Sequence, residues 1–247
     1  MTLGTIRRWL AVGLLGLASA TVGLAAEVPA RIVVVMDDNY PPYVFRDTDG
    51  QLKGYLIDLW ALWSAHSGIQ AELRPTEWSQ ALQRFGNHEA DVIDTIFRTP
   101  MRETFMDFTP PYTDVNVSIM VHKSILGIDS AATLKAFAVG VKQGDACADH
   151  LQEAGVRRTD SYPSYEALIK AAATGEVRIF CLDAPPAHFL MARNGVDKDF
   201  REAFTLYQGQ FHRGVHKGES ALIERIDSGF KAIPARDYAA LQEKWMG

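Results

Sequence analysis

Short apolar runs alternate with amphipathic segments along most of this 247-residue chain. The runs are four to ten residues long and predict buried strands, whereas segments with an apolar residue every three or four positions predict helices. Strands are expected at Arg31–Met36, Ala71–Arg74, Asp91–Phe97, Val115–His122, Phe137–Val141, Val177–Leu182 and Leu206–Val215. Helices are expected at Leu56–Ser67, Ser79–Phe85, Ala148–Ala154, Ser164–Ala173, Pro185–Asn194, Ala221–Ile233 and Arg236–Met246. This alternation is typical of an α/β protein.

The order of these elements predicts two α/β lobes, the second inserted into the first. Lobe 1 is expected at residues 27–111 plus 212–247, and lobe 2 at 117–206. Two crossovers would join them, with hinge segments at 112–116 and 207–211. A hinge of this kind lets two lobes close over a ligand.

The first 26 residues have the pattern of a secretory signal peptide. Arg7 and Arg8 precede an uncharged apolar segment, and Ala20 or Ala26 fits a cleavage site after small residues. A membrane anchor is the alternative, since 18 uncharged residues reach the lower limit for a spanning helix. Cleavage is favoured by the small residues and the polar chain that follows, which places the mature protein in the periplasm as a soluble monomer.

Charge and cysteine content exclude several classes of function. Removing Arg7 and Arg8 with the leader changes the formal net charge from −5 to about −7, and an acidic chain is poorly suited to nucleic acid. Cys147 and Cys181 could form a disulfide in an oxidising compartment or be two small buried residues. We expect them to lie close together. No metal site and no cofactor are expected, because the histidines and cysteines do not cluster.

The stretch Asp91–Tyr112 (DVIDTIFRTPMRETFMDFTPPY) contains the first candidate ligand residue. Thr99 is a good helix N-cap and proline at the next position suits a first helical turn, so Arg102 is expected in a short helix just past a strand end. Ligands bind at that edge of open α/β sheets, and an arginine can hold a carboxylate through two hydrogen bonds. We expect its side chain to be solvated before a ligand binds. The alternative is a surface arginine paired with Glu103 or Asp107.

This stretch resembles the bacterial extracellular solute-binding proteins of family 3, the periplasmic receptors for polar amino acids. Further pieces in the same order carry the resemblance: VVVMD followed by YPPY near the start, GYLIDLW at 54–60, and the terminal KWMG at 244–247. The resemblance implies the type II periplasmic-binding-protein fold, with the ligand in a cleft between the lobes. It also implies a small-molecule ligand and a membrane protein, either permease or sensor, as partner.

Aromatic residues and one acid of lobe 1 are candidates for ligand contact. By resemblance, Tyr40 and Trp78 fall where such receptors clamp the ligand side chain, and Phe97 ends the strand before Arg102. The alternative for the aromatic residues is ordinary packing. Asp37 ends the first strand and could bind a cationic group of the ligand or merely cap the next turn.

Lobe 2 supplies a second acid and a departure from the family. Asp183 resembles the acid that binds the ligand ammonium, and it could also cap the helix that starts at Pro185. In Lys142–Cys147 (KQGDAC), Asp145 stands where the family has Thr or Ser. Its carboxylate would occupy the helix N-terminus and repel a ligand carboxylate. Arg98 adds a further cation, so Arg98, Lys142 and Asp145 join the candidate site.

Three classes of function fit this sequence. The first is a binding protein that delivers a small polar solute, an amino acid or related amine, to an ABC-type importer. The second is a sensory module for a membrane cyclase or kinase, because the motifs FRTPMR, DFTPPY, GDAC, FCLDAPP and QFHRGVHKG resemble a subgroup used as periplasmic sensor domains. As the chain stops at Gly247, it would be a free receptor, a partner of a separate membrane protein, or a fragment. The third is an enzyme similar to periplasmic cyclohexadienyl dehydratases, with Asp145 as a general acid.

Overall fold

A computed structural model describes Met1 and residues 30–246 of the chain. The predicted signal peptide and its cleavage positions therefore lie outside the described residues, apart from Met1. Among the described residues, no helix is long and apolar enough to cross a membrane.

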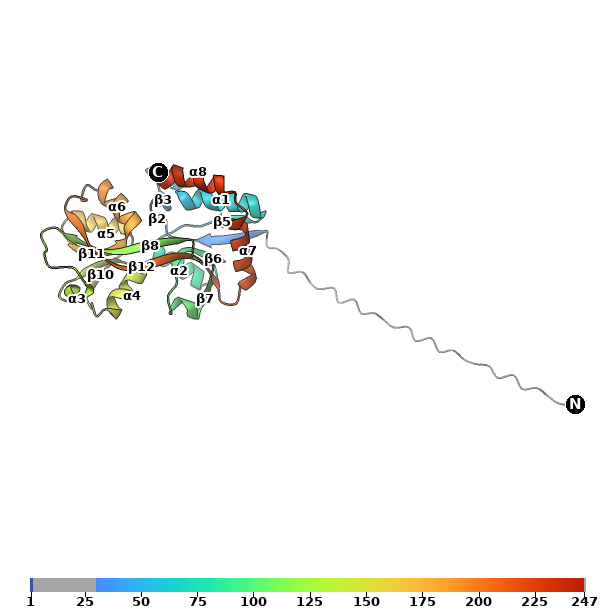
Figure 1. Cartoon of the computed structure of the whole chain (residues 1–247), viewed down its shortest axis with the longest axis horizontal. Coiled ribbons are helices and arrows are strands. Elements are labelled where there is room, and N and C mark those ends of the chain that lie inside the picture. Colours follow the sequence, from blue (N-terminus) through green and yellow to red (C-terminus); the bar gives the residue numbers. More distant parts are fainter. Residues whose placement is uncertain (2–29, 247) are drawn as a thin grey trace.

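The main feature is a nine-stranded mixed sheet with helices above and below it in Figure 1. Its strand order is β10-β9-β11-β8-β12-β6-β1-β5, and β7 pairs with β12. The strands are β1 (Arg31–Val35), β5 (Gln70–Leu73), β6 (Val92–Phe97), β7 (Met106–Phe108), β8 (Thr113–His122), β9 (Val139–Lys142), β10 (Thr159–Tyr162), β11 (Ile179–Asp183) and β12 (Phe200–His216). A separate small sheet contains β2 (Asn39–Tyr40), β3 (Val44–Arg46) and β4 (Leu52–Lys53).

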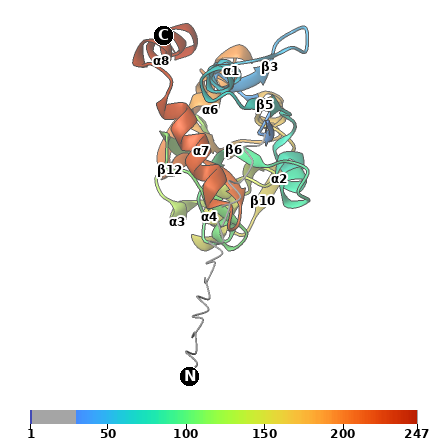
Figure 2. The ribbon, with the colours of Figure 1, turned by 90° about the vertical axis from the view of Figure 1, so that its right-hand side faces the viewer.

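The helices form two groups at opposite ends of the sheet (Figure 1). The β6 side, with β6, β1 and β5, carries α1 (Tyr55–Ser67), α2 (Trp78–Gly86), α7 (Ser220–Lys231) and α8 (Ala235–Met246). Figure 2 views the molecule from the end that carries α1, α2 and α7, with α7 in front. The β11 side, with β11, β9 and β10, carries α3 (Ala131–Leu134), α4 (Ala146–Glu153), α5 (Tyr165–Ala173) and α6 (Ala184–Arg193). A 3-10 turn, η1 (Arg102–Thr104), follows β6.

Two long strands connect these sides. β8 and β12 pair antiparallel, with Tyr207 opposite Val117 and Phe211 opposite Thr113. The predicted hinge segments 112–116 and 207–211 thus face each other in one ribbon at the middle of the molecule (Figure 1). The lobe boundaries and the hinge role themselves remain predictions.

The core of the β6 side depends on the aromatic face of α1. Trp60 and Trp63 are fully buried, with ring centroids 5.1 Å apart in an edge-to-face arrangement. The Trp63 indole N–H donates to the carbonyl of Ile226 at 3.0 Å. Gly229 is required there, since a Cβ at that position would lie 2.3 Å from the Trp63 indole nitrogen. Each such buried side chain contributes about 2–3 kcal/mol of apolar transfer free energy.

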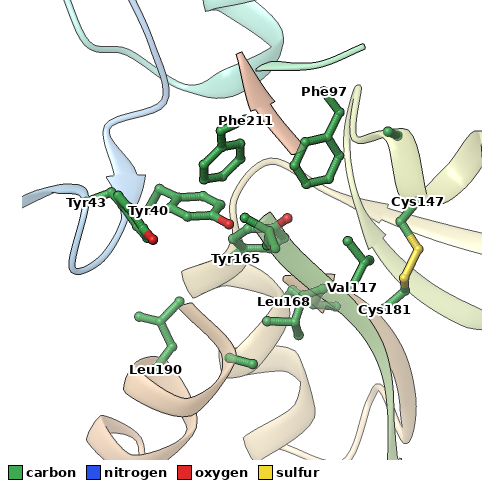
Figure 3. Packing of buried hydrophobic residues seen from close by; sticks show 14 of the residues in the cluster. Tyr40, Tyr43, Phe97, Val117, Cys147, Tyr165, Leu168, Cys181, Leu190 and Phe211 are labelled. Carbon is green, nitrogen blue, oxygen red and sulfur yellow. A yellow bond between two sulfur atoms is a disulfide. The ribbon is translucent and has the colours of Figure 1, made fainter. Parts of the chain in front are cut away.

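Cys147 and Cys181 form a disulfide on the β11 side, with their Cα atoms 6.5 Å apart (Figure 3). The predicted proximity is confirmed, and of the two alternatives that the sequence left open the structure has the disulfide. The bond joins the first turn of α4 to the middle of β11. Each cysteine is two residues from a candidate ligand residue, Asp145 and Asp183 respectively.

Candidate functional site

A small cavity lies between the β6 side and the β11 side, at the carboxyl ends of the strands. Asp37 follows β1, Phe97 ends β6, Lys142 ends β9 and Asp183 ends β11. This is the edge at which open α/β sheets bind ligands. The lining residues are Asp37, Tyr40, Trp78, Thr95, Phe97, Arg102, Lys142, Asp145, Ala146, Asp183 and Phe211. Eight of the nine predicted site residues are therefore brought together.

The free volume in this conformation is about 20 Å³, enough for about one water molecule. Figure 3 shows why: the rings of Tyr40, Phe97, Tyr165 and Phe211 gather at the site. Tyr40 lies 5.9 Å from Tyr165 and 5.4 Å from Phe211, measured between ring centroids. The polar groups of the two sides also bind one another, so a ligand must displace contacts to enter.

The ammonium group of Lys142 occupies the centre of this arrangement. It forms an ion pair with Asp37 across the cavity, with Nζ 2.7 Å from Oδ2, and lies 3.8 Å from the ring centroid of Tyr165. The rings of Tyr40 and Trp78 are each 5.6 Å away. Burial acts to lower the pKa of Lys142, but the charges of Asp37, Asp145 and Asp183 outweigh it and raise the pKa. Lys142 is therefore a buried cation held by aromatic faces and a carboxylate.

Asp37 caps the turn after β1, and its second oxygen pairs with a cation of the protein. Its Oδ1 accepts a hydrogen bond from the backbone N–H of Asn39 at 3.0 Å, which caps the turn after β1. Its Oδ2 accepts the hydrogen bond from Lys142. A single carboxylate can do both because it has two acceptor oxygens.

Asp145 caps α4, as the sequence predicts. Its Oδ1 accepts from the backbone N–H of Cys147 at 2.9 Å, and its Oδ2 accepts from the hydroxyl of Tyr165 at 2.5 Å. The N-terminus of α4 thus already holds an internal anion, which disfavours a ligand carboxylate at the same place.

Asp183 presents an unpaired acceptor to the cavity. Its Oδ2 accepts from the hydroxyl of Tyr40 at 2.6 Å, but its Oδ1 is buried and has no hydrogen-bond partner among the described residues. Burial, followed by the nearby charge of Asp145, raises the pKa of Asp183 to about 7. Although Asp183 occupies the N-cap position of α6, its side chain makes no capping bond. The open oxygen favours a ligand donor at this point.

Arg102 is the cation on the β6 side of the cavity. Its guanidinium donates to the carbonyls of Phe97 at 2.8 Å and Gly144 at 3.3 Å, with no carboxylate within ion-pair distance among the described residues. The expectation of a solvated side chain is wrong: Arg102 is 8% exposed, and burial lowers its pKa. The predicted helix is a 3-10 turn, although the Thr99 hydroxyl does accept from the backbone N–H of Arg102 at 3.3 Å.

The remaining predicted residues divide into a cavity residue and a surface residue. The indole N–H of Trp78 donates to the carbonyl of Gly144 at 3.0 Å, so Trp78 and Arg102 bind the same atom across the cavity. Arg98 instead lies at the surface in an ion pair with Glu103 and does not line the cavity. Its geometry gives no support to a role in ligand contact.

Sequence reasoning missed three cavity residues, Thr95, Ala146 and Phe211. Thr95 has a φ of 58°, which is rare for a β-branched residue, and its hydroxyl donates to the carbonyl of Asp94 at 2.6 Å. Phe211 lies in the QFHR segment, and this motif was the one signal that could have identified it as a cavity residue. Tyr165, which binds Asp145, was assigned only to a helix. The described residues contain no group of three or more His, Cys, Asp or Glu positioned for a metal ion.

Comparisons with known proteins define the family. The model of the bacterial extracellular solute-binding proteins, family 3, matches residues 32–247, so this chain belongs to that family. The α/β binding-protein fold predicted from the sequence is confirmed. The family is one of extracellular and periplasmic solute-binding proteins.

Among particular relatives, the L-cystine-binding protein TcyJ of Escherichia coli is 28% identical over 92% of this chain and 88% of its own length. The arginine-binding periplasmic protein of Mannheimia haemolytica is 22% identical, with 91% and 95% covered. A solved histidine kinase sensor domain with similarity to periplasmic binding proteins superposes with a TM-score of 0.81 at 23% identity, covering 89% of this chain and 97% of the other. The first two of these relatives are named for the amino acids that they bind, L-cystine and arginine.

Proposed function

We propose that this chain is a periplasmic receptor for a small zwitterionic solute, an amino acid or related amine, and that it delivers the solute to an ABC-type importer. Family membership supports solute binding, and the two curated relatives support the amino-acid class. The observation that carries the proposal is the pairing of two incompletely satisfied groups in one cavity. Asp183 has an open acceptor oxygen, and Arg102 has no anionic partner within ion-pair distance among the described residues.

The charges of the cavity support the same ligand class. Three carboxylates (Asp37, Asp145 and Asp183) face two cations (Lys142 and Arg102). The Asp37–Lys142 pair and the Asp145 cap are satisfied internally, which leaves Asp183 and Arg102 for a ligand. A ligand ammonium would bind Asp183 and a ligand carboxylate would bind Arg102, through charge-assisted hydrogen bonds.

Ligand entry then requires the two sides to separate. The contacts across the cavity are Lys142 with Asp37, Tyr40 with Asp183, Gly144 with both Trp78 and Arg102, and Asn39 with Glu166. We infer that an incoming ligand replaces part of these contacts. Binding and closure would therefore be linked in one equilibrium.

A thermal-shift screen of the mature chain against amino acids, amines and small organic acids is the first test. A ligand at a hundredfold excess over Kd adds about 2.7 kcal/mol, or a rise of about 5–10 °C in Tm. Calorimetry on Arg102→Ala should then show binding weakened by about 2–4 kcal/mol, because the ligand carboxylate loses its partner in the closed cavity. Asp183→Ala should have a similar effect at the ammonium end.

Arg98→Ala is the matched control, since Arg98 is four residues away and lies outside the cavity. It should bind within about twofold of wild type, as expected for a solvated surface group. If Arg102→Ala stayed within about threefold of wild type instead, the proposed ligand contact would be rejected in favour of another cation such as Lys142.

A sensory module is the second candidate, and the likeness of fold to a kinase sensor domain is the observation that favours it. Uptake of labelled ligand by cells with and without the gene distinguishes the two: loss of uptake supports transport, whereas unchanged uptake with an altered signalling output supports sensing.

A dehydratase activity is the third candidate function, and assays with prephenate and arogenate test it. N-terminal sequencing of the exported protein tests the cleaved leader.

A further inference from the structure

A second buried arginine, Arg213, lies away from the ligand cavity on β12, inside the QFHRGVHKG motif that the proposed function does not use. It is 5% exposed. Its guanidinium carbon lies 3.5 Å from the ring centroid of Phe230 and 4.2 Å from that of Tyr112. Trp60 lies slightly farther away, at 5.5 Å. Aromatic rings therefore pack closely around this cation.

The one carboxylate that pairs with Arg213 is shared. Asp94 Oδ2 lies 3.4 Å from Arg213 Nε and accepts a hydrogen bond from the indole of Trp60 at 2.7 Å. Its Oδ1 accepts from the hydroxyl of Tyr112 at 2.7 Å. No side-chain N–H of Arg213 makes a hydrogen bond to another described residue, and Nε is fully buried. A guanidinium has five N–H donors, so this one keeps donors without acceptors.

A cavity of about 140 Å³ adjoins this guanidinium. It is lined by Tyr55, Leu59, Thr109, Pro110, Pro111, Tyr112, Thr113, Arg213, Asp227, Phe230 and Tyr238. The phenol of Tyr55 makes no hydrogen bond to another described residue, and the phenol of Tyr238 donates to the carbonyl of Phe230 at 2.9 Å. The one carboxylate in the lining, Asp227, is paired with Lys231 at 2.5 Å. We name this cavity the Arg213 pocket.

We propose that the Arg213 pocket binds a small free carboxylate anion. A carboxylate fits because its two oxygens match the planar fork of a guanidinium. The Tyr55 hydroxyl would supply a further donor. The pocket volume suits an ion of the size of acetate or slightly larger. This site is independent of the proposed solute cavity, whose lining shares no residue with it.

Sodium acetate is the probe, compared with sodium chloride at equal ionic strength. For wild type we expect a saturable rise in Tm, of about 5–10 °C at a hundredfold excess over Kd. We also expect a change in tryptophan fluorescence, since Trp60 lies beside the guanidinium. Arg102→Ala should keep this response, which separates the Arg213 pocket from the solute cavity.

Two variants examine the pocket itself. Arg213→Lys should weaken acetate binding at least tenfold, because lysine loses the bidentate fork. Tyr55→Phe should weaken it two- to fivefold, and this variant keeps the test valid if Arg213→Lys does not fold, because the Tyr55 hydroxyl has no internal partner to lose. A response equal to that of chloride, or one lost in Arg102→Ala and kept in Tyr55→Phe, would overturn the proposal.

Discussion

Two clusters of acids, cations and aromatic rings lie in this molecule, and they differ in where their members come from. In the solute cavity, Asp37, Tyr40 and Arg102 meet Lys142 and Asp183, which belong to the opposite side of the sheet. In the second cluster, Asp94, Trp60, Tyr112 and Arg213 all lie on the β6 side or next to it. Both clusters are buried, and the carboxylates of both accept hydrogen bonds.

Buried charges alone therefore do not identify a site that opens for a ligand. Contacts within the second cluster join residues on the β6 side or next to it, so we expect them to persist when the two sides separate. Contacts in the solute cavity can break if the two sides separate, because water then solvates the polar groups on each side. We therefore expect the Asp94 contacts of the second cluster to contribute most to stability, beside the anion site proposed at Arg213, and the solute cavity to determine solute binding and the position of the two sides.

The largest expected effect is on the second cluster. Asp94→Ala removes the acceptor for Trp60 and Tyr112 and leaves Arg213 buried without its carboxylate. We expect a loss of about 3–5 kcal/mol in the free energy of unfolding, measured in urea. A loss below about 1 kcal/mol would show that water reaches this cluster, and the contrast between the two regions would fail.

Breaking the disulfide should have the next largest effect. The bond closes a loop with a sequence separation of 34 residues, so Cys147→Ala combined with Cys181→Ala should cost about 2–4 kcal/mol. The bond also joins the segments that carry Asp145 and Asp183, so ligand affinity should fall along with stability. The single variant Cys147→Ser, which cannot form the bond either, should match the double variant. Unchanged ligand affinity in the single and double variants would show that α4 and β11 position Asp145 and Asp183 without the disulfide.

Lys142→Met tests the cavity side of the comparison. It breaks the ion pair with Asp37 but leaves a side chain of similar length among the aromatic rings. We expect a loss of only about 1.5–2 kcal/mol in unfolding free energy, since separation of the two sides lets water solvate Asp37. Small-angle X-ray scattering should show a larger radius of gyration without ligand. A loss as large as that of Asp94→Ala, with no change in radius, would mean that the two sides do not separate.

The fold could be predicted from the sequence where the pattern is local and strong. The buried runs at β1, β6 and β11 and the capped helix α1 were placed within about two residues, because continuous apolar runs and a following glycine give direct signals. The small β2–β3–β4 sheet, α3, β7 and β10 were not predicted. Elements of two to four residues are too short to show a period, and pairing across the sheet stabilises them.

The site could be predicted only in part for a related reason. The capping role of Asp145 depends on neighbouring residues and was predicted correctly. The ion pair of Lys142 with Asp37 joins residues 105 positions apart, and no local pattern in the sequence predicts a contact over that separation. The sequence did not distinguish Arg98 from Arg102. The 3-10 turn after β6 directs Arg102 into the cavity and leaves Arg98 at the surface, and so short a turn has no clear sequence pattern.

The smallest expected effect is the dependence of ligand binding on pH, and it follows from the open oxygen of Asp183. Burial and Asp145 raise the pKa of Asp183 to about 7 in the closed cavity, above its ordinary value of 3.8. The folded state therefore holds a proton that the unfolded state has lost, and the resulting stability, present at low pH, disappears as the pH rises through about 7. A ligand ammonium needs the ionised carboxylate and must displace this proton.

Affinity should consequently rise about tenfold between pH 6 and pH 8, a change of about 1.4 kcal/mol, and level off above pH 8. Calorimetry near pH 7 in two buffers of different ionisation enthalpy should detect the release of a fraction of a proton on binding. The hydrogen bond from Tyr40 lowers the pKa of Asp183, so Tyr40→Phe should shift the rise to higher pH. Arg98→Ala, a change outside the cavity, should leave the profile in place. A flat profile in both wild type and Tyr40→Phe would mean that the ligand ammonium does not bind Asp183, and Asp183 would then be a structural acid like Asp94.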